Sequence, residues 1–473
     1  MTLTPRRSHT NPSQAPAPAL RWVLTVLCLG VVLAQVDTSI VLLATQAIGA
    51  HFHASVATLQ WVVDGYNLSY AVLLLSGGLL ADLMGRRRTF MAGVALFTGA
   101  SLLCAWAPSV QVLVLGRALA GVGAACLIPA SLALVRVVWP HPDARNRVLG
   151  IWAASNGLAL AIGPSLGGLL LRHLGWRSVF LAVVPLGVLT LLGAWAWVPE
   201  SADAQGRDFD VGAQVLAGGA LAGLAIAAIH AREQPWLAGV AALLALLALA
   251  GFVAVERTRG ARALVPLGTF RLPAFSGAAL VTVAMTFGMY GALFLLPLEW
   301  QASGRLSAQQ AGLALLPMAL VFVLVSPFSG ALTRRLGARV QACAGSGVIA
   351  LGLLTVGWGG TGSAWAATLG GALLGLALTG LGMGLATAPL MGMAVGAVPP
   401  ARAGTASALI NVARMVGATL GVALLGMLYA SAGGGGHGLR LAMTVGAVVQ
   451  LLCVALGWRV MGAADGAARD GRG

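Results

Sequence analysis

Fourteen long apolar runs constrain what this chain can fold into more than any other feature. A helix needs about 20 mainly apolar residues to cross the hydrocarbon core of a bilayer. Backbone polar groups within lipid must be satisfied inside the segment, so each run is expected to form an α-helix. The expected spans are 22–44, 59–81, 89–107, 110–134, 148–171, 177–198, 211–230, 236–255, 275–297, 309–331, 340–358, 364–388, 404–429 and 439–461. The sequence therefore predicts an all-α integral membrane protein with about 14 transmembrane helices.

The composition agrees with lipid as the main solvent. Hydrophobic residues make up 59% of the chain and charged residues 9%, whereas ordinary soluble domains carry about 25% charge. The formal net charge is +15, and every basic residue is arginine. These arginines lie in short clusters between apolar runs rather than on one polar domain. That distribution favours a membrane topology signal over nucleic-acid binding.

Arginine placement predicts the orientation. With an even number of spans, both termini lie on one side of the membrane. On this topology 21 of the 28 arginines flank the side with the termini, and five flank the other side. Arg117 and Arg414 lie within spans. Because positive loops stay inside, both termini are expected in the cytoplasm.

A short internal sequence repeat predicts two related halves. The segment GLLADLMG at 78–85 recurs as GALTRRLG at 330–337, 252 residues later. Parallel repeats of this kind are common in transporters. Two bundles of six helices plus one inserted pair account for the span count. The expected units are a flexible tail (1–20), an N-terminal bundle (21–200), an inserted helix pair (208–256), a C-terminal bundle (273–461) and a second cytoplasmic tail (462–473).

The first copy of the repeat raises an electrostatic problem. Asp82 falls at the C-terminal end of the second span, where the helix dipole is negative and an anion is unfavourable. The three arginines at 86–88 follow at once and can compensate for it. Gly85 would allow the tight turn that this needs. We therefore expect a gating loop built from Gly78, Asp82, Gly85, Arg86 and Arg87.

Several segments together resemble the major facilitator superfamily. GGLLADLMGRRR is similar to the loop between its second and third spans, and VLGRALAGVGAACLIPA, which contains Arg117, is similar to its fourth-span motif. HLGWRSVFLAVVPLGVL, AGLALLPMAL and ARAGTASALINVARMVGATLGVALLG resemble the branch of fourteen-span drug:proton antiporters. The segment GLALAIGPSLGG resembles the antiporter motif of the fifth span, with Gly157, Gly163, Pro164, Gly167 and Gly168. The likeness extends over roughly residues 20–460.

This resemblance implies a secondary-active exporter of amphipathic drugs or antibiotics, cationic ones among them, working by alternating access. It implies no cofactor, the energy coming from the proton gradient, and a monomer in a bacterial inner membrane. Its partners would be a small-molecule substrate, protons and the lipid bilayer, with no nucleic acid, no metal and no enzyme activity. Two alternatives on the same fold are a dedicated exporter of one metabolite or antibiotic and a proton:solute symporter. The second copy of the loop departs from the family pattern, because Arg334 replaces the aspartate and Ala338 replaces the next arginine.

Two charged residues within the spans are candidates for proton coupling. Ionisable groups inside a membrane are expensive and mark functional sites by default. Asp37 lies in the first span, in QVDTSIV, which also resembles the motif of the antiporter branch. Arg117 lies in the fourth span, and we expect Asp37 to be its partner. The pair is either a switch that opens on protonation or a fixed structural ion pair.

Each of three further residues has two possible roles. Asp64 lies about one turn into the second span and is either a second proton site, also able to bind substrate, or a solvated interfacial acid. Glu299 follows Pro297 and either tunes the charge preference for substrate or is solvated outside the membrane. Trp300 either stacks on a cationic aromatic ligand or anchors the chain at the interface. Asp37, Asp64, Glu299 and Trp300 are the substrate-binding candidates.

Overall fold

The computed structural model describes residues 17–202, 210–231, 234–259, 265–359, 365–399 and 402–470. Within these ranges the chain is helical, apart from short turns and connections, and contains no strand. Fourteen of its helical segments are long and apolar enough to cross a membrane, and they match the expected spans one for one. The predicted fold class is therefore confirmed. Most of the expected N-terminal tail lies outside the described residues, as do 203–209 and 471–473.

Most of the helices are longer than the apolar runs that predict them, although the seventh span matches its run and the sixth ends one residue before its run does. In chain order they are α1 (Ala17–Phe52), α2 (Val56–Met84), α3 (Arg86–Ala105), α4 (Val110–Val138), α5 (Pro142–Leu174), α6 (Arg177–Leu181), α7 (Val183–Trp197), α8 (Val211–His230), α9 (Pro235–Arg259), the 3₁₀ turn η3 (Leu267–Arg271), α10 (Pro273–Ala302), α11 (Ala308–Ala314), α12 (Leu316–Leu336), α13 (Ala338–Gly359), α14 (Trp365–Gly396), α15 (Ala403–Ser431) and α16 (Gly435–Asp470). The last helix continues into the segment expected as a tail.

Two spans are broken into two helices each. The sixth is α6 followed by α7, and the tenth is α11 followed by α12. Pro185 and Pro317 lie in the first turns of α7 and α12. A proline has no N–H to give to the preceding turn, so the helix is interrupted there and restarts.

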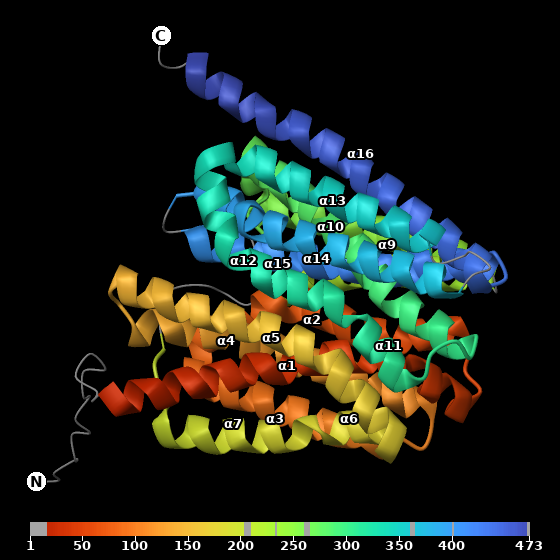
Figure 1. The fold of residues 1–473 in the computed structure, drawn as a ribbon. Helices are drawn as coiled ribbons and strands as arrows, with labels where there is room; N and C mark the ends of the chain where they lie inside the picture. Colours follow the sequence, from red (N-terminus) through yellow and green to blue (C-terminus); the bar gives the residue numbers. More distant parts are fainter. Residues whose placement is uncertain are drawn as a thin grey trace, which may run out of the picture.

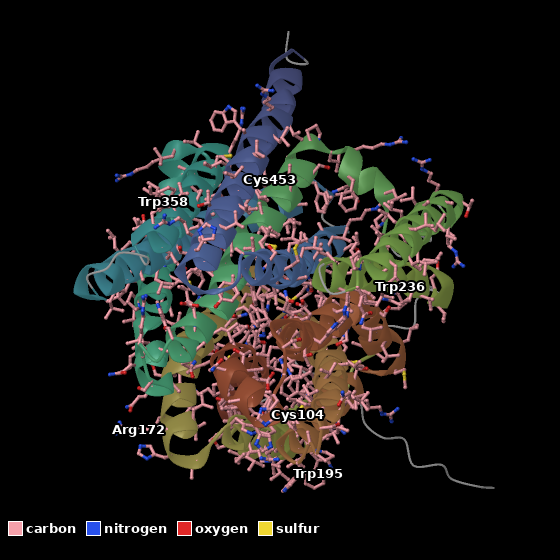
Figure 2. All side chains as sticks on the ribbon, turned by 90° about the vertical axis from the view of Figure 1, so that its right-hand side faces the viewer. Cys104, Arg172, Trp195, Trp236, Trp358 and Cys453 are labelled. Carbon is pink, nitrogen blue, oxygen red and sulfur yellow. The ribbon has the colours of Figure 1, made fainter. Side chains whose placement is uncertain are left out.

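The helices form two groups (Figure 1), and a pair of helices lies to one side of them (Figure 2). Helices α1–α7 make the first half and α10–α16 the second. Helices α8 and α9 pack on each other, and α8 also packs against α2 and α15. The start of α1 and the end of α16 lie at one end of the molecule, which we term the arginine-rich end. Figure 2 is viewed toward the opposite, arginine-poor end. It shows Cys104 in the first half, Cys453 in the second and Trp236 of α9 to one side.

Glycines let corresponding helices approach closely in the two halves. A Cβ at Gly93 of α3 would lie 2.8 Å from the carbonyl oxygen of Gly123 on α4. In the second half, a Cβ at Gly345 of α13 would lie 2.8 Å from the carbonyl oxygen of Gly382 on α14. Gly93 and Gly345 are 252 positions apart, the same offset as the sequence repeat. Small residues allow this backbone-to-backbone packing in membranes.

Hydrogen bonds join the two halves at the arginine-poor end. Gln60 of α2 donates to the carbonyl oxygens of Val422 (2.7 Å) and Ala423 (2.8 Å) on α15. Gln301 of α10 donates to the carbonyl oxygen of Leu43 at 3.1 Å. Arg172 at the end of α5 donates to the side chain of Gln309 on α11 at 2.6 Å. The halves are thus fastened together at this end, where α11 lies against the first half (Figure 1).

Candidate functional site

A buried ion pair links α1 to α4 in the interior of the first half. Asp37 Oδ2 lies 2.5 Å from Arg117 Nη1, and the two side chains are 0% and 2% exposed. Arg117 also donates through Nε to the carbonyl oxygen of Val62 on α2 at 3.1 Å, and its guanidinium lies 4.7 Å from the centre of the Tyr66 ring. Three helices therefore meet at one cation. The structure brings together the two residues that the sequence analysis pairs.

The ion pair leaves one acceptor unused. Asp37 Oδ1 is buried and makes no hydrogen bond among the described residues. A buried charge is tolerable only when it is paired and hydrogen-bonded. The pair is therefore balanced in charge but incompletely satisfied, because one carboxylate oxygen has no hydrogen-bond donor.

Asp64 lies on the face of α2 that meets α15. It follows Gln60 by four residues, so the two side chains share one face of the helix. Because α2 and α15 run antiparallel, and Gln60 bonds to Val422 and Ala423, the residue opposite Asp64 lies about four positions earlier on α15. Counting four positions back from Ala423 gives Thr419. Asp64 and Thr419 are both 0% exposed.

This stretch of the α2–α15 contact contains unsatisfied polar atoms. The Asp64 carboxylate lies next to the side chain of Asn67, one turn further along α2, but neither group makes a hydrogen bond of good geometry in the described part of the chain, nor does the hydroxyl of Thr419. Such atoms cost about 1–3 kcal/mol each when they lack a partner. The interpretation of Asp64 as a solvated interfacial acid is wrong, because the side chain is 0% exposed.

The loop between α2 and α3, which we expect from the sequence to act as a gate, lies at the arginine-rich end. Arg86 donates to Asp82 Oδ1 from Nη2 at 2.8 Å and from Nε at 3.1 Å, so the arginine neutralises the anion at the end of α2. Gly85 joins α2 to α3 with φ +106°, in the left-handed region that favours glycine. Gly78 lies near Pro129 of α4, which a Cβ on the glycine would contact at 3.5 Å.

Glu200 completes this loop, and the sequence analysis missed it. Its carboxylate accepts from the backbone N–H groups of Arg87 (3.1 Å) and Arg88 (3.2 Å), the first residues of α3. The Arg87 side chain donates to the carbonyl oxygen of Val198, also beyond α7. A carboxylate suits a helix N-terminus because the N–H groups there lack partners and the dipole is positive. The only sequence signal was an acid directly after a span, 112 residues from Arg88.

The second copy of the loop uses neutral groups. Gln341 donates to Ser329 Oγ (2.7 Å) and to the carbonyl oxygen of Leu385 (2.9 Å), and it accepts from the Thr333 hydroxyl at 2.8 Å. Gly337 keeps the left-handed turn, with φ +81°. An amide network thus takes the place of the aspartate–arginine pair, and Arg334 stands in the aspartate position.

The glycines of α5 face both halves of the molecule. Gly163 lies against Ser39 of α1, and a Cβ at Gly167 would lie 3.1 Å from Ile40. A Cβ at Gly168 would lie 2.7 Å from the Cα of Gln309 on α11, and Gly157 faces Phe322 of α12. Pro164 lies inside α5, and its carbonyl group faces Gly312 of α11. The motif therefore lies in the contact between α5 and the second half, and no bulkier residue fits at Gly163 or Gly168 without movement.

Glu299 borders a cavity of about 830 Å³ at the arginine-poor end. Walls come from α2, the inserted helix α8, α10 and α15. Glu299 is 6% exposed, and its Oε2 accepts from the Tyr429 hydroxyl at 2.5 Å. The interpretation of Glu299 as a solvated residue is therefore wrong. Trp300 is 4% exposed and packs in the apolar core, so it neither lines this cavity nor anchors the chain at the interface.

Comparisons with known proteins identify the family. The sequence profile of the Major Facilitator Superfamily matches residues 27–422 and 279–468. The chain belongs to the major facilitator superfamily. Among curated proteins, the multidrug resistance protein Stp of Mycobacterium tuberculosis is 36% identical, over 85% of this chain and 74% of that protein. The tetracenomycin C resistance and export protein of Streptomyces glaucescens is 34% identical, over 90% of this chain and 80% of its own.

Solved structures agree with this major facilitator fold. A bacterial homologue of the human lysosomal transporter Spinster, in an inward-facing and unoccupied conformation, aligns with a TM-score of 0.70. The alignment covers 94% of this chain and 98% of that one at 17% identity. At that identity the likeness concerns the fold alone. As a member of this transporter family, the chain is a transport protein and not an enzyme.

Proposed function

We propose that this protein exports amphipathic drugs or antibiotics, cationic ones among them, in exchange for protons. The export of drugs is supported by relatives that are named for multidrug resistance or for antibiotic resistance and export. The proposal places it as a monomer in a bacterial inner membrane with both termini in the cytoplasm, as the arginine distribution favours. The coupling to protons rests on the residues of the first half.

The observation that carries the coupling is the ion pair of Asp37 and Arg117, 2.5 Å apart and out of contact with water. Protonating Asp37 would leave the guanidinium as an uncompensated buried charge, which costs several kcal/mol. Arg117 would then need water or another acceptor, and reaching one requires α1, α2 and α4 to move relative to each other. A proton on one atom can therefore bias the position of three helices.

Asp64 supplies a second proton site on this proposal. In the described part of the chain no cation pairs with it, and the helical register set by Gln60 places it on the face of α2 that meets α15. Separation of α2 from α15 at the arginine-poor end would bring water to Asp64, and closure would exclude it. Its access to protons would thus follow the motion of the halves, as exchange across a membrane requires.

Alternating access would proceed by rocking of the halves. The bonds from Gln60, Gln301 and Arg172 hold the arginine-poor end closed. The close contact of α5 with α11 at Gly168 provides a surface about which the halves can pivot. The gating loop at the other end, with Asp82, Arg86 and Glu200, would secure the opposite state.

Exchange in liposomes tests the function. Purified protein is reconstituted with a trapped pH dye, and a panel of amphipathic drugs is added with and without a pH gradient. Drug movement against an opposite proton flux is expected for the wild type, with a loss of at least tenfold for Asp37→Asn. Proton antiport would be refuted if that variant exchanged drug for protons at the wild-type rate. It would also be refuted if the rate of drug transport stayed the same after the pH gradient is collapsed.

The dedicated-exporter alternative is favoured by one observation, the similarity to a protein named for a single antibiotic. The same panel of amphipathic drugs distinguishes a dedicated exporter from a multidrug exporter. Movement of one compound alone would support a dedicated exporter, and movement of several unrelated amphipaths would support multidrug efflux. Proton and drug moving in the same direction would instead identify a symporter.

A further inference from the structure

The cavity beside Glu299 is made by three separate parts of the chain. Gln60 comes from α2 in the first half, Ile229 from the inserted helix α8, and Glu299, Met427 and Tyr429 from the second half. Its volume of about 830 Å³ falls within the range of small-molecule sites, which hold mainly apolar walls and a few polar groups. It lies at the closed end, away from the gating loop.

Glu299 is held in a fixed position in the wall of this cavity. Tyr429 donates to Oε2 at 2.5 Å and in turn accepts from the backbone N–H of Gly435 at 3.3 Å. No arginine or histidine forms an ion pair with Glu299 in the part of the chain that the structure describes, and no described hydrogen bond reaches Oε1. Glu299 is the one acidic residue in the lining. The cavity therefore offers a carboxylate oxygen among apolar side chains.

The cavity shares a residue with the closed contact between the halves. Gln60 lines it and also makes the two bonds to Val422 and Ala423. Opening this end must draw α2 away from α15, which breaks those bonds and separates the first-half wall from the second-half walls. A ligand that touches both walls is thus bound only in the closed arrangement, and it stabilises that arrangement by mass action.

We propose that this cavity is a binding site for organic cations with an apolar body, and that its occupation holds the arginine-poor end closed. The cationic group would pair with Glu299, and the apolar body would pack on Ile229 and Met427. Such a ligand would inhibit transport from the arginine-poor side, in contrast to a substrate carried through the interior. The site does not depend on Asp37 or on proton coupling.

Direct binding tests the site without any need for transport. Benzyltriethylammonium, a permanently charged aromatic cation, is titrated into detergent-purified protein by calorimetry, and benzenesulfonate serves as the anionic comparison. We expect the wild type to bind the cation. In Glu299→Gln the dissociation constant should be at least tenfold larger. Tyr429→Phe keeps the charge and should stay within about threefold of wild type. Ile229→Trp fills the cavity from α8 and should weaken binding as Glu299→Gln does.

Two control variants show whether the binding belongs to this cavity. Glu200→Gln removes an acid at the opposite end and should bind the cation as wild type does. Asp37→Asn should lose exchange yet keep binding, so failure of the proposed function and failure of this site give different results. In liposomes, the cation should slow exchange only from the arginine-poor side, measured relative to the uninhibited rate of each variant. Equal binding by wild type and Glu299→Gln, or inhibition only from the arginine-rich side, would overturn the proposal.

Discussion

Asp37 and Arg117 are in direct contact, with 2.5 Å between Oδ2 and Nη1. The two residues are 80 positions apart in the sequence and lie on different helices, α1 and α4. Neither side chain reaches solvent. In a buried pair the desolvation of both charges offsets much of their attraction, so the pair itself adds little stability. Removal of one partner has a large effect, because it leaves the other charged and buried.

This asymmetry predicts the stability of variants at the pair. Arg117→Gln should destabilise the purified protein by about 3–5 kcal/mol, since Asp37 then lacks its countercharge. The double variant Asp37→Asn/Arg117→Gln should recover most of that loss but still fail to exchange drug for protons. Thermal unfolding in detergent, followed by intrinsic fluorescence, measures the first effect. Equal melting temperatures of the single and double variants would argue against a charge-balanced pair.

Gly85 should be intolerant of any side chain. Its φ is +106°, and a Cβ would lie 2.7 Å from Glu200 Oε1. Gly85→Ala therefore combines backbone strain with a clash at the carboxylate, and we expect a loss of about 1–3 kcal/mol together with slower transport. Gly99→Ala on α3 is the matched control, since nothing lies within 4 Å of its Cβ position. A similar loss for both variants would show that the loop geometry is not the cause.

Glu200 should act as the cap of α3. Glu200→Ala removes the acceptor of the Arg87 and Arg88 backbone N–H groups, and loss of a capping residue costs about 0.5–2 kcal/mol. Hydrogen–deuterium exchange of the first turn of α3 should become faster. Glu200→Gln keeps an acceptor oxygen but loses the charge, so it should lie between wild type and alanine. An unchanged rate of hydrogen–deuterium exchange in Glu200→Ala would exclude a capping role.

Gln60 should set the balance between closed and open forms. Gln60→Leu removes two hydrogen bonds between the halves, each worth about 0.5–1.5 kcal/mol. The population with an open arginine-poor end should rise accordingly. Double electron–electron resonance spectroscopy with spin labels at His53 and Ser303 should then show longer distances between the halves. The same labels on a Thr25→Ala background, where the lost bond lies within α1, should leave the distances as in wild type.

Much of the fold could be predicted from the sequence because the bilayer acts on local segments. An apolar run of sufficient length becomes a spanning helix wherever it lies in the chain. The turn at Gly85 and the pairing of Asp82 with Arg86 are also local, four residues apart. For Asp37 and Arg117 the reasoning needed only that a buried cation must find an acid.

The remainder depended on contacts between distant segments. No local pattern indicates that Glu200 caps α3 or that Gln60 bonds to α15. Glu299 had two interpretations because position along a helix does not decide whether neighbouring helices cover a residue; here Tyr429, 130 positions later, does so.

The sequence by itself determined how many helices cross the membrane, which loops carry positive charge and which ionisable groups lie in the spans. These properties follow from transfer of each segment between water and lipid, a free energy that sums over local residues. Only the tertiary structure decided which groups meet, which end is closed and where a cavity remains. Those outcomes follow from packing between helices, whose side chains are brought together by the three-dimensional arrangement and not by spacing along the chain.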